Sequence, residues 1–173
     1  MTHFVGLVVA NSEEEVEELL ISYSEHAEVE AYFKPVDLDR MVAYANENNI
    51  AFTNPIELVE YWVNEPGVLS ESGDVGYMSK YNPEGQWDWY EIGGGWANII
   101  PGDYCLAEAV QTYFAQAKKD YLPAVIVDSD GWHAAQDFGW FGTSSNVPGN
   151  ENIVLEKLQE HKGKLVYIVD FHC

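Results

Sequence analysis

The chain has 173 residues and carries 29 acidic side chains against eight basic ones, which gives a formal charge of −21. A surface this negative repels DNA, RNA and anionic membranes, and a single arginine, Arg40, argues further against direct binding of nucleic acid or phosphate. The composition is 47% apolar, and no apolar run approaches the length of a bilayer span, so we expect a globular protein in the cytoplasm.

The chain begins with a predicted strand and an acidic helix. Residues 4–10 (FVGLVVA) form a valine-rich run that is typical of a buried strand. Ser12 and Glu15 make the S-x-x-E pattern of a capping box, which predicts that a helix begins there. Val16, Leu19, Leu20 and Tyr23 recur at helical spacing and predict its buried face. Four glutamates are then left on the exposed face: Glu13, Glu14, Glu17 and Glu18.

Two more helices are predicted before the pattern changes. One runs from Asp37 to the asparagine-rich stretch 46–49, and the next begins at Asn54-Pro55 and ends at Pro66-Gly67. Residues 68–75, which include Glu71 and Asp74, are predicted to be an acidic loop.

The middle of the chain predicts a tryptophan-rich β-hairpin. Residues 77–81 and 86–92 have the alternation of strands and flank the turn sequence NPEG. Three glycines at 93–95 end the second strand. Tryptophans on such a hairpin either cover a core or form a recognition surface, and the sequence leaves both readings open.

The last third predicts two helices and three strands. A helix capped by Asp103 is expected to continue to residue 117, followed by a strand at 124–127 that returns through an Asp130-Gly131 turn. A helix at 152–161 and a strand at 165–171 close the chain. We therefore expect a single α+β domain over residues 1–173, with an antiparallel or mixed sheet, helices packed on one face, and a ferredoxin-like arrangement as the first hypothesis.

Histidines and cysteines do not predict a metal centre. His133, together with His172 and Asp170 near the C-terminus, could form a metal or acid–base cluster, but the histidines lack the short spacing of zinc-binding motifs. Cys105 and Cys173 form no CxxC pair. We expect reduced thiols, no metal and no other cofactor.

Several motifs carry a family resemblance. The run QWDWYEIGGGW, the stretch AVIVDSDGWHAAQDFGWFG and the chain end VDFHC resemble a family of small uncharacterised phage and prophage proteins with WDWY-x-IGGRW, DGxWH and GWFG motifs. The resemblance implies an origin in a mobile element and no established activity. Gly95 stands where the family pattern has arginine, so a pocket that used this arginine is not implied for this chain.

Charge and resemblance together favour an inhibitor of phage type. Such a protein would bind a basic, nucleic-acid-handling defence protein of a bacterial host, for example a CRISPR nuclease or a restriction enzyme, and compete with nucleic acid by mimicking its charge. The residues expected to contact that partner are Glu13, Glu14, Glu17, Glu18, Glu71, Asp74, Trp87 and Trp89. One alternative is a small-molecule binding module or hydrolase that uses the hairpin and His133 as a pocket. Another is an assembly protein of a virion.

Overall fold

The computed structural model describes residues 3–118, 122–138 and 144–173, and they divide into two compact units. The main unit comprises Met1–Ala27 and Asn82–Cys173, and the inserted unit comprises Glu28–Tyr81. We expected one domain over residues 1–173, and that expectation stays a prediction. Among the described residues, no helix is long and apolar enough to cross a bilayer.

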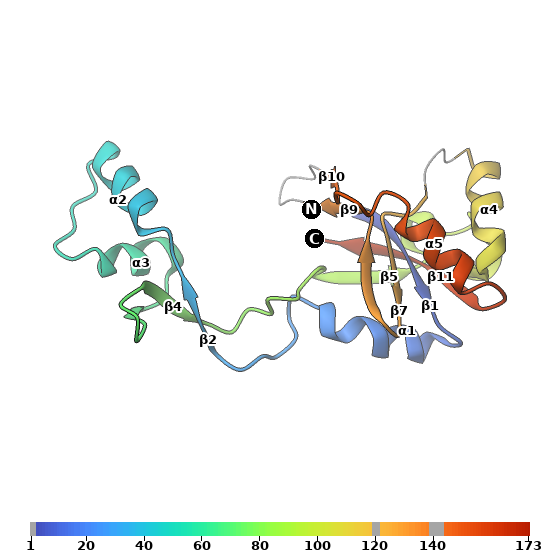
Figure 1. Cartoon of the computed structure of the whole chain (residues 1–173), viewed down its shortest axis with the longest axis horizontal. Helices are drawn as coiled ribbons and strands as arrows, with labels where there is room; N and C mark the ends of the chain where they lie inside the picture. The colour runs from blue at the N-terminus through green and yellow to red at the C-terminus, as the bar shows by residue number, and fades with distance from the viewer. Residues whose placement is uncertain (1–2, 119–121, 139–143) are drawn as a thin grey trace. The chain divides into compact units, whose positions relative to one another are not determined.

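The main unit is built on a six-stranded mixed sheet, which confirms the predicted α+β class. Its strand order is β5-β11-β1-β7-β8, and β6 also pairs with β11 (Figure 1). The central strand β1 is antiparallel to β11 and parallel to β7. The strands are β1 (His3–Val9), β5 (Trp89–Ile92), β6 (Tyr104–Leu106), β7 (Val125–Asp128), β8 (Gly131–Ala134) and β11 (Leu165–His172).

Helices cover both faces of this sheet. Successive side chains of β1 point to opposite faces, so Phe4 and Val8 join one core cluster while Leu7 and Val9 join another. The first cluster is closed by α1 (Glu13–Leu20), and the second by α4 (Val110–Gln116) and α5 (Ile153–Glu160), on the other side of the sheet in Figure 1. The expected placement of helices on one face, and with it the ferredoxin-like arrangement, is therefore wrong.

Helix α1 begins where the capping pattern predicted. The Ser12 hydroxyl accepts a hydrogen bond from the Glu15 backbone N–H at 3.3 Å. The Glu15 carboxylate accepts from the backbone N–H of Asn11 at 2.7 Å and from its amide at 2.8 Å, one residue before the position that a capping box normally uses. The short 3₁₀ helix η1 (Ile21–Tyr23) then ends the helical segment.

The inserted unit contains the two helices that the sequence predicted and a sheet that it did not. Helix α2 (Leu38–Glu47) is capped by the Asp37 side chain, and α3 (Ile56–Val63) follows Pro55. The same unit contains a three-stranded sheet with the strand order β2-β4-β3. Its strands are β2 (Tyr32–Pro35), β3 (Gly67–Leu69) and β4 (Val75–Ser79), so most of the predicted loop at 68–75 is a β-hairpin.

The predicted tryptophan hairpin is not formed. β4 pairs with β2 and β3 inside the inserted unit, whereas β5 pairs with β11 in the main unit. The turn residue Asn82 instead fixes the return of the chain to the main unit, because its side-chain amide donates to the carbonyls of Ser22 and Ser24 at 2.8 and 2.9 Å. The glycines do end the strand: Gly93 and Gly94 adopt positive φ where η2 (Gly94–Trp96) begins.

The segment after the glycines also differs from prediction. Asp103 closes the 3₁₀ turn η3 (Pro101–Asp103) and does not cap a helix. β6 follows, because Cys105 pairs with Val166 of β11, and the 3₁₀ helix η4 (Ala107–Ala109) precedes a shorter α4.

The C-terminal elements agree with prediction. β7, its return strand β8, α5 and β11 lie at the expected places. Two short paired strands, β9 (Gln136–Phe138) and β10 (Ser144–Asn146), were not predicted. The GWFG motif at 139–142 lies outside the described residues.

Candidate functional site

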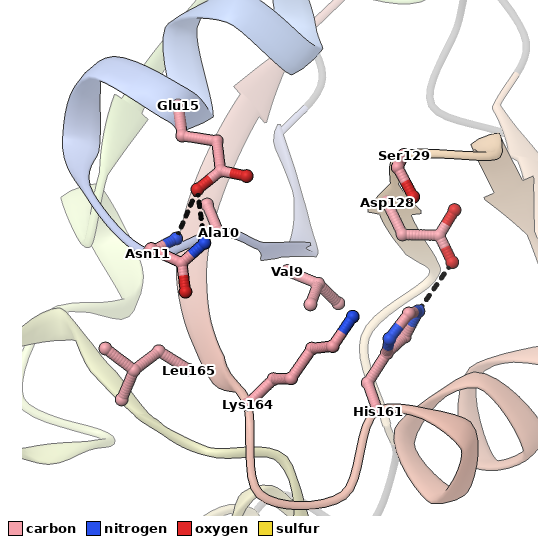
Figure 2. A pocket seen from close by; sticks show the side chains of 9 residues that line it. All are labelled: Val9, Ala10, Asn11, Glu15, Asp128, Ser129, His161, Lys164 and Leu165. Atoms are coloured by element: carbon pink, nitrogen blue, oxygen red, sulfur yellow. Dashed lines mark hydrogen bonds and ion pairs between the residues drawn. The ribbon is translucent and has the colours of Figure 1, made fainter.

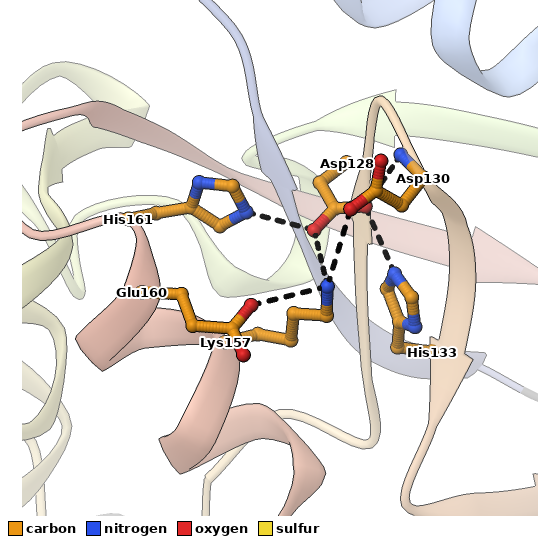
Figure 3. A network of polar contacts seen from close by, with 6 residues as sticks. All are labelled: Asp128, Asp130, His133, Lys157, Glu160 and His161. Atoms are coloured by element: carbon orange, nitrogen blue, oxygen red, sulfur yellow. Dashed lines mark hydrogen bonds and ion pairs between the residues drawn. The ribbon is translucent and has the colours of Figure 1, made fainter.

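A buried carboxylate at the end of β7 gathers polar side chains from three elements. Asp128, whose side chain is only 1% exposed, accepts hydrogen bonds from Nε2 of His133 at 2.9 Å and from Nε2 of His161 at 2.7 Å (Figure 3). The Lys157 ammonium lies 3.2 Å from Oδ2 of Asp128, and the backbone N–H of Asp130 donates to Oδ1 at 2.8 Å. The carboxylate is thus fully surrounded by donors.

The fold explains why these groups meet. In the β7–β8 hairpin, His133 lies opposite Ile126, two residues before Asp128, so both polar side chains share the face that α5 covers. Lys157 and His161 are four residues apart and therefore point from the same side of α5 and its C-terminal cap. Of β7, β8 and α5, only the two strands of the hairpin are consecutive in the sequence, and folding brings α5 to them.

The network holds Asp128 as an anion. Burial alone would raise the pKa of Asp128, but the hydrogen bonds from His161, His133, the Asp130 backbone and Lys157 outweigh it and hold this pKa far below its usual range. Burial would lower the pKa of Lys157, yet its contacts with Asp128 and Glu160 raise it. Because an ionised carboxylate only accepts hydrogen bonds, both histidines donate through Nε2–H.

A small pocket adjoins this network at the carboxyl ends of β1 and β7. Its volume is about 140 Å³, and Figure 2 shows His161 and Lys164 facing into it. The carboxyl ends of neighbouring parallel strands are where α/β sheets commonly bind ligands. The polar side chains that line the pocket belong to Asn11, Glu15, Asp128, Ser129, His161 and Lys164.

The pocket offers the elements of acid–base chemistry. His161 donates through Nε2–H to the Asp128 carboxylate, so a neutral ring in this position has its lone pair on Nδ1, which has no hydrogen-bond partner within the described ranges. The Lys164 ammonium adds a positive charge near the same space. This arrangement suits removal of a proton from a small ligand or from water.

The acidic face predicted for α1 is present. Glu13, Glu14, Glu17 and Glu18 are all exposed, whereas Val16 and Leu20 on the opposite side are buried. In the part of the chain that the structure describes, none of the four glutamates lies within 4.0 Å of a basic side chain. These carboxylates are available to a partner.

The other two acidic residues expected at the interface lie in the inserted unit. Glu71 and Asp74 are exposed in the turn between β3 and β4. Asp74 accepts hydrogen bonds from the hydroxyls of Ser72 at 2.5 Å and Ser70 at 3.4 Å, which stabilise the turn. Because they belong to the other compact unit, the structure does not join them to the glutamates of α1.

The two tryptophans have different environments. Trp87 is buried in the core under α1, so its expected role in partner binding is contradicted by its position. Trp89 is 42% exposed on β5 and stacks on the His172 ring with 3.3 Å between ring centroids. His133 lies on β8, at the opposite edge of the sheet from β5, so the expected pocket of hairpin tryptophans and His133 is not formed.

Sequence reasoning missed most of the Asp128 network. It singled out His133 and the Asp130-Gly131 turn but not Asp128, Lys157 or His161. The i, i+4 spacing of Lys157 and His161, on a helix expected to end near residue 161, was the available signal. Nothing in the sequence indicates that this helix packs over β7 and β8.

Comparisons with known proteins do not assign this site. The chain matches no protein-family model, no curated protein and no solved structure.

Proposed function

We propose that this protein is an acidic inhibitor that binds a basic, nucleic-acid-handling defence protein in the cytoplasm of a bacterial host and competes with nucleic acid. Steering by a strongly negative surface accelerates association with a positive groove, and carboxylates on a helix can take the place of phosphates. CRISPR nucleases hold their nucleic acid in such positively charged channels, and we place them with restriction enzymes as the first partners to test.

The observation that carries the proposal is the shortage of cationic partners for the carboxylates. Among the described residues, only Asp128, Asp130, Glu160 and Asp170 lie within 4.0 Å of a basic side chain, and Asp170 only through histidine. An ordinary surface intersperses both signs of charge. The exposed carboxylates therefore retain a field that only an external cation or a basic protein can neutralise.

Exposed aromatic side chains provide the second ingredient of an interface. In the inserted unit, Tyr44 and Trp62 form an edge-to-face pair with 4.7 Å between ring centroids, and both are exposed, as is Tyr61. Tyrosine and tryptophan are the residues most enriched at binding hot spots. They give the inserted unit aromatic side chains of its own for contact with a partner protein.

The test is inhibition of DNA cleavage by a purified RNA-guided nuclease and by a purified restriction endonuclease. We expect the wild-type chain to slow cleavage, and we expect added salt to weaken this effect because it screens steering. Replacement of Glu13, Glu14, Glu17 and Glu18 by glutamine should reduce the association rate with the inhibited nuclease while leaving the fold intact, since glutamine has a similar helix propensity.

A matched control removes the same charge elsewhere. Replacing Glu84, Asp137, Glu151 and Glu156 by their amides also takes four negative charges from exposed positions of the main unit. Inhibition that survives this change but not the change in α1 supports the assignment of the acidic helix face. An α1 variant that inhibits as strongly as the wild type at every salt concentration would show that these glutamates are only a solvated surface.

The pocket beside Asp128 favours a second candidate function, a small-molecule binding or hydrolytic site. The buried Asp128–His161 pair next to Lys164 is the observation behind it. The pocket differs from the one expected from the sequence, because it contains neither tryptophan of the predicted hairpin.

Generic substrates test this second candidate. If His161 is a general base, the chain should hydrolyse p-nitrophenyl acetate faster than the buffer does, and His161→Gln should remove about 10²-fold or more of that enhancement, the usual contribution of such catalysis. Lys118→Gln, a loss of a basic residue outside the pocket, is the control. Activity equal in both variants would place the reaction elsewhere.

A further inference from the structure

Strand register brings three potential metal ligands together at one end of the main sheet. His3 of β1 lies directly opposite His172 of β11, and Asp170 is two residues before His172 on the same strand. Because alternate residues of a strand share a face, Asp170 and His172 point to the same side, and His3 joins them across the ladder. Figure 1 shows the two ends of the chain close together.

Their ligand atoms are close enough to share one ion. One nitrogen of each histidine and one carboxylate oxygen of Asp170 all lie within 4.8 Å of one another. Bonds of about 2.0–2.2 Å to a tetrahedral zinc ion place neighbouring ligand atoms about 3.3–3.6 Å apart. Small side-chain rotations close the difference, and His3 has room for them because its side chain is 52% exposed.

His172 provides an independent indication of a missing partner. It is only 2% exposed, and within the described residues neither of its ring nitrogens has a hydrogen-bond partner. Buried polar groups are nearly always satisfied, so an orphaned imidazole needs an explanation.

Two contacts hold the Asp170 carboxylate in place. Its Oδ2 accepts a hydrogen bond from the backbone N–H of Gly95 at 2.8 Å, and Nδ1 of His3 lies 3.3 Å from Oδ1. A backbone donor that orients a ligating carboxylate is the usual outer support of a metal site. Trp89 stacks on the His172 ring and restrains its orientation from the other side.

We propose that His3, Asp170 and His172 bind a divalent transition-metal ion of the zinc type. Two imidazoles and one carboxylate form a ligand set typical of zinc sites that keep a coordination position open for water or substrate. The partial exposure of His3 gives the ion a route from solvent. Whatever its use by the protein, the ion would satisfy one of the two unpartnered ring nitrogens of His172.

The Asp128 network shows how a buried carboxylate of this chain is neutralised by a lysine in place of a metal ion. There too, two histidines contact one carboxylate, but the Lys157 ammonium supplies the positive charge, 3.2 Å from Asp128. No basic side chain other than His3 lies within 4.0 Å of Asp170 among the described residues. The metal was not expected from the sequence because the ligands His3 and Asp170 are 167 positions apart and meet only through strand register.

Binding of zinc to the untagged, chelator-treated full chain tests the proposal. We expect isothermal titration calorimetry with zinc chloride to show one ion bound per chain, and cobalt chloride to give visible absorption bands from a protein-bound ion. Asp170→Asn and His3→Gln should each weaken zinc binding by about tenfold or more, since even outer-shell changes cost about 10- to 100-fold. Both variants avoid the fully buried His172, so we expect them to fold.

The control is His26→Gln, which removes an exposed histidine of the same unit. It should bind zinc like the wild type, and unfolding midpoints measured in EDTA should be alike for all four proteins. Failure of the wild type to take up zinc or cobalt would overturn the proposal. So would equal zinc affinity in the wild type, Asp170→Asn and His3→Gln, because the ion would then sit elsewhere.

Discussion

At the scale of single residues, Asp128 shows how burial and pairing decide the role of a carboxylate. Its side chain is removed from water but receives hydrogen bonds from two histidines and a backbone N–H and an ion pair from Lys157. Removing one partner from a buried ion pair usually costs more than the pair contributes, because the other charge is left without compensation. The same carboxylate also orients His161 beside the pocket.

The pH dependence of stability tests this account. The pKa of Asp128 is lower in the folded protein than the value of about 3.9 expected for an unfolded chain, so its contribution to stability is complete above about pH 4 and is lost as the pH falls further. Asp128→Asn should lower the free energy of unfolding at pH 7 by about 3 to 5 kcal/mol. Its stability should also fall less steeply between about pH 4 and about pH 2.

Urea denaturation at a series of pH values measures both effects. Asp137→Asn, a change at an exposed aspartate without a charged partner among the described residues, is the control and should leave the pH profile unchanged. Parallel pH profiles for the wild type and Asp128→Asn would mean that folding does not lower the pKa of Asp128.

At the scale of elements, local patterns located most helices and strands but not their partners. β1, α1, β7 and β11 were predictable because valine-rich runs, a capping serine and turn residues are local signals. The prediction of a hairpin at 77–92 was wrong for two reasons. The apparent turn at Asn82 is the point where the chain returns to the main unit, and β5 pairs with the long strand β11. Choice of strand partner depends on residues far apart in sequence.

The candidate sites divide in the same way into those that a local pattern predicts and those that depend on pairing between distant segments. The exposed glutamates of α1 were predictable, because helical spacing separates them from Val16 and Leu20. The Asp128 network and the His3, Asp170 and His172 cluster were not, because α5 must first pack over β7 and β1 must first pair with β11. Chemistry that depends on non-local pairing becomes visible only in the fold.

The close approach between strands also constrains single positions of β1. An added Cβ at Gly6 would lie 2.4 Å from the Phe171 ring and 2.7 Å from Val125. The central strand therefore has a glycine where a valine would continue the local pattern, because β11 and β7 place large side chains over that position. Sequence periodicity alone does not report this requirement.

At the scale of the whole molecule, both units are strongly acidic. The inserted unit has ten acidic side chains against three basic ones, although it is less than a third of the chain. The main unit has 19 against five. Such a charge stabilises the dispersed state in solution but adds repulsion to the folded state.

This repulsion predicts that salt stabilises the protein. Raising sodium chloride from about 10 mM to about 150 mM shortens the screening length from about 30 Å to about 8 Å, so carboxylates on the same surface repel each other less. We expect the free energy of unfolding at neutral pH to increase over this range. Replacing Glu13, Glu14, Glu17 and Glu18 by glutamine should flatten this dependence on salt, because it removes like charges four residues apart on a helix, which cost a few tenths of a kcal/mol each.

Urea denaturation at each salt concentration provides the measurement, with chloride chosen because sulfate also strengthens apolar burial. The same experiment bears on the proposed function, because a basic partner that neutralises the carboxylates would remove a repulsion that the free protein carries. If sodium chloride changes the stability of neither the wild type nor the quadruple variant, the carboxylates are too far apart to repel each other. Such a surface would be a poor substitute for closely spaced phosphates.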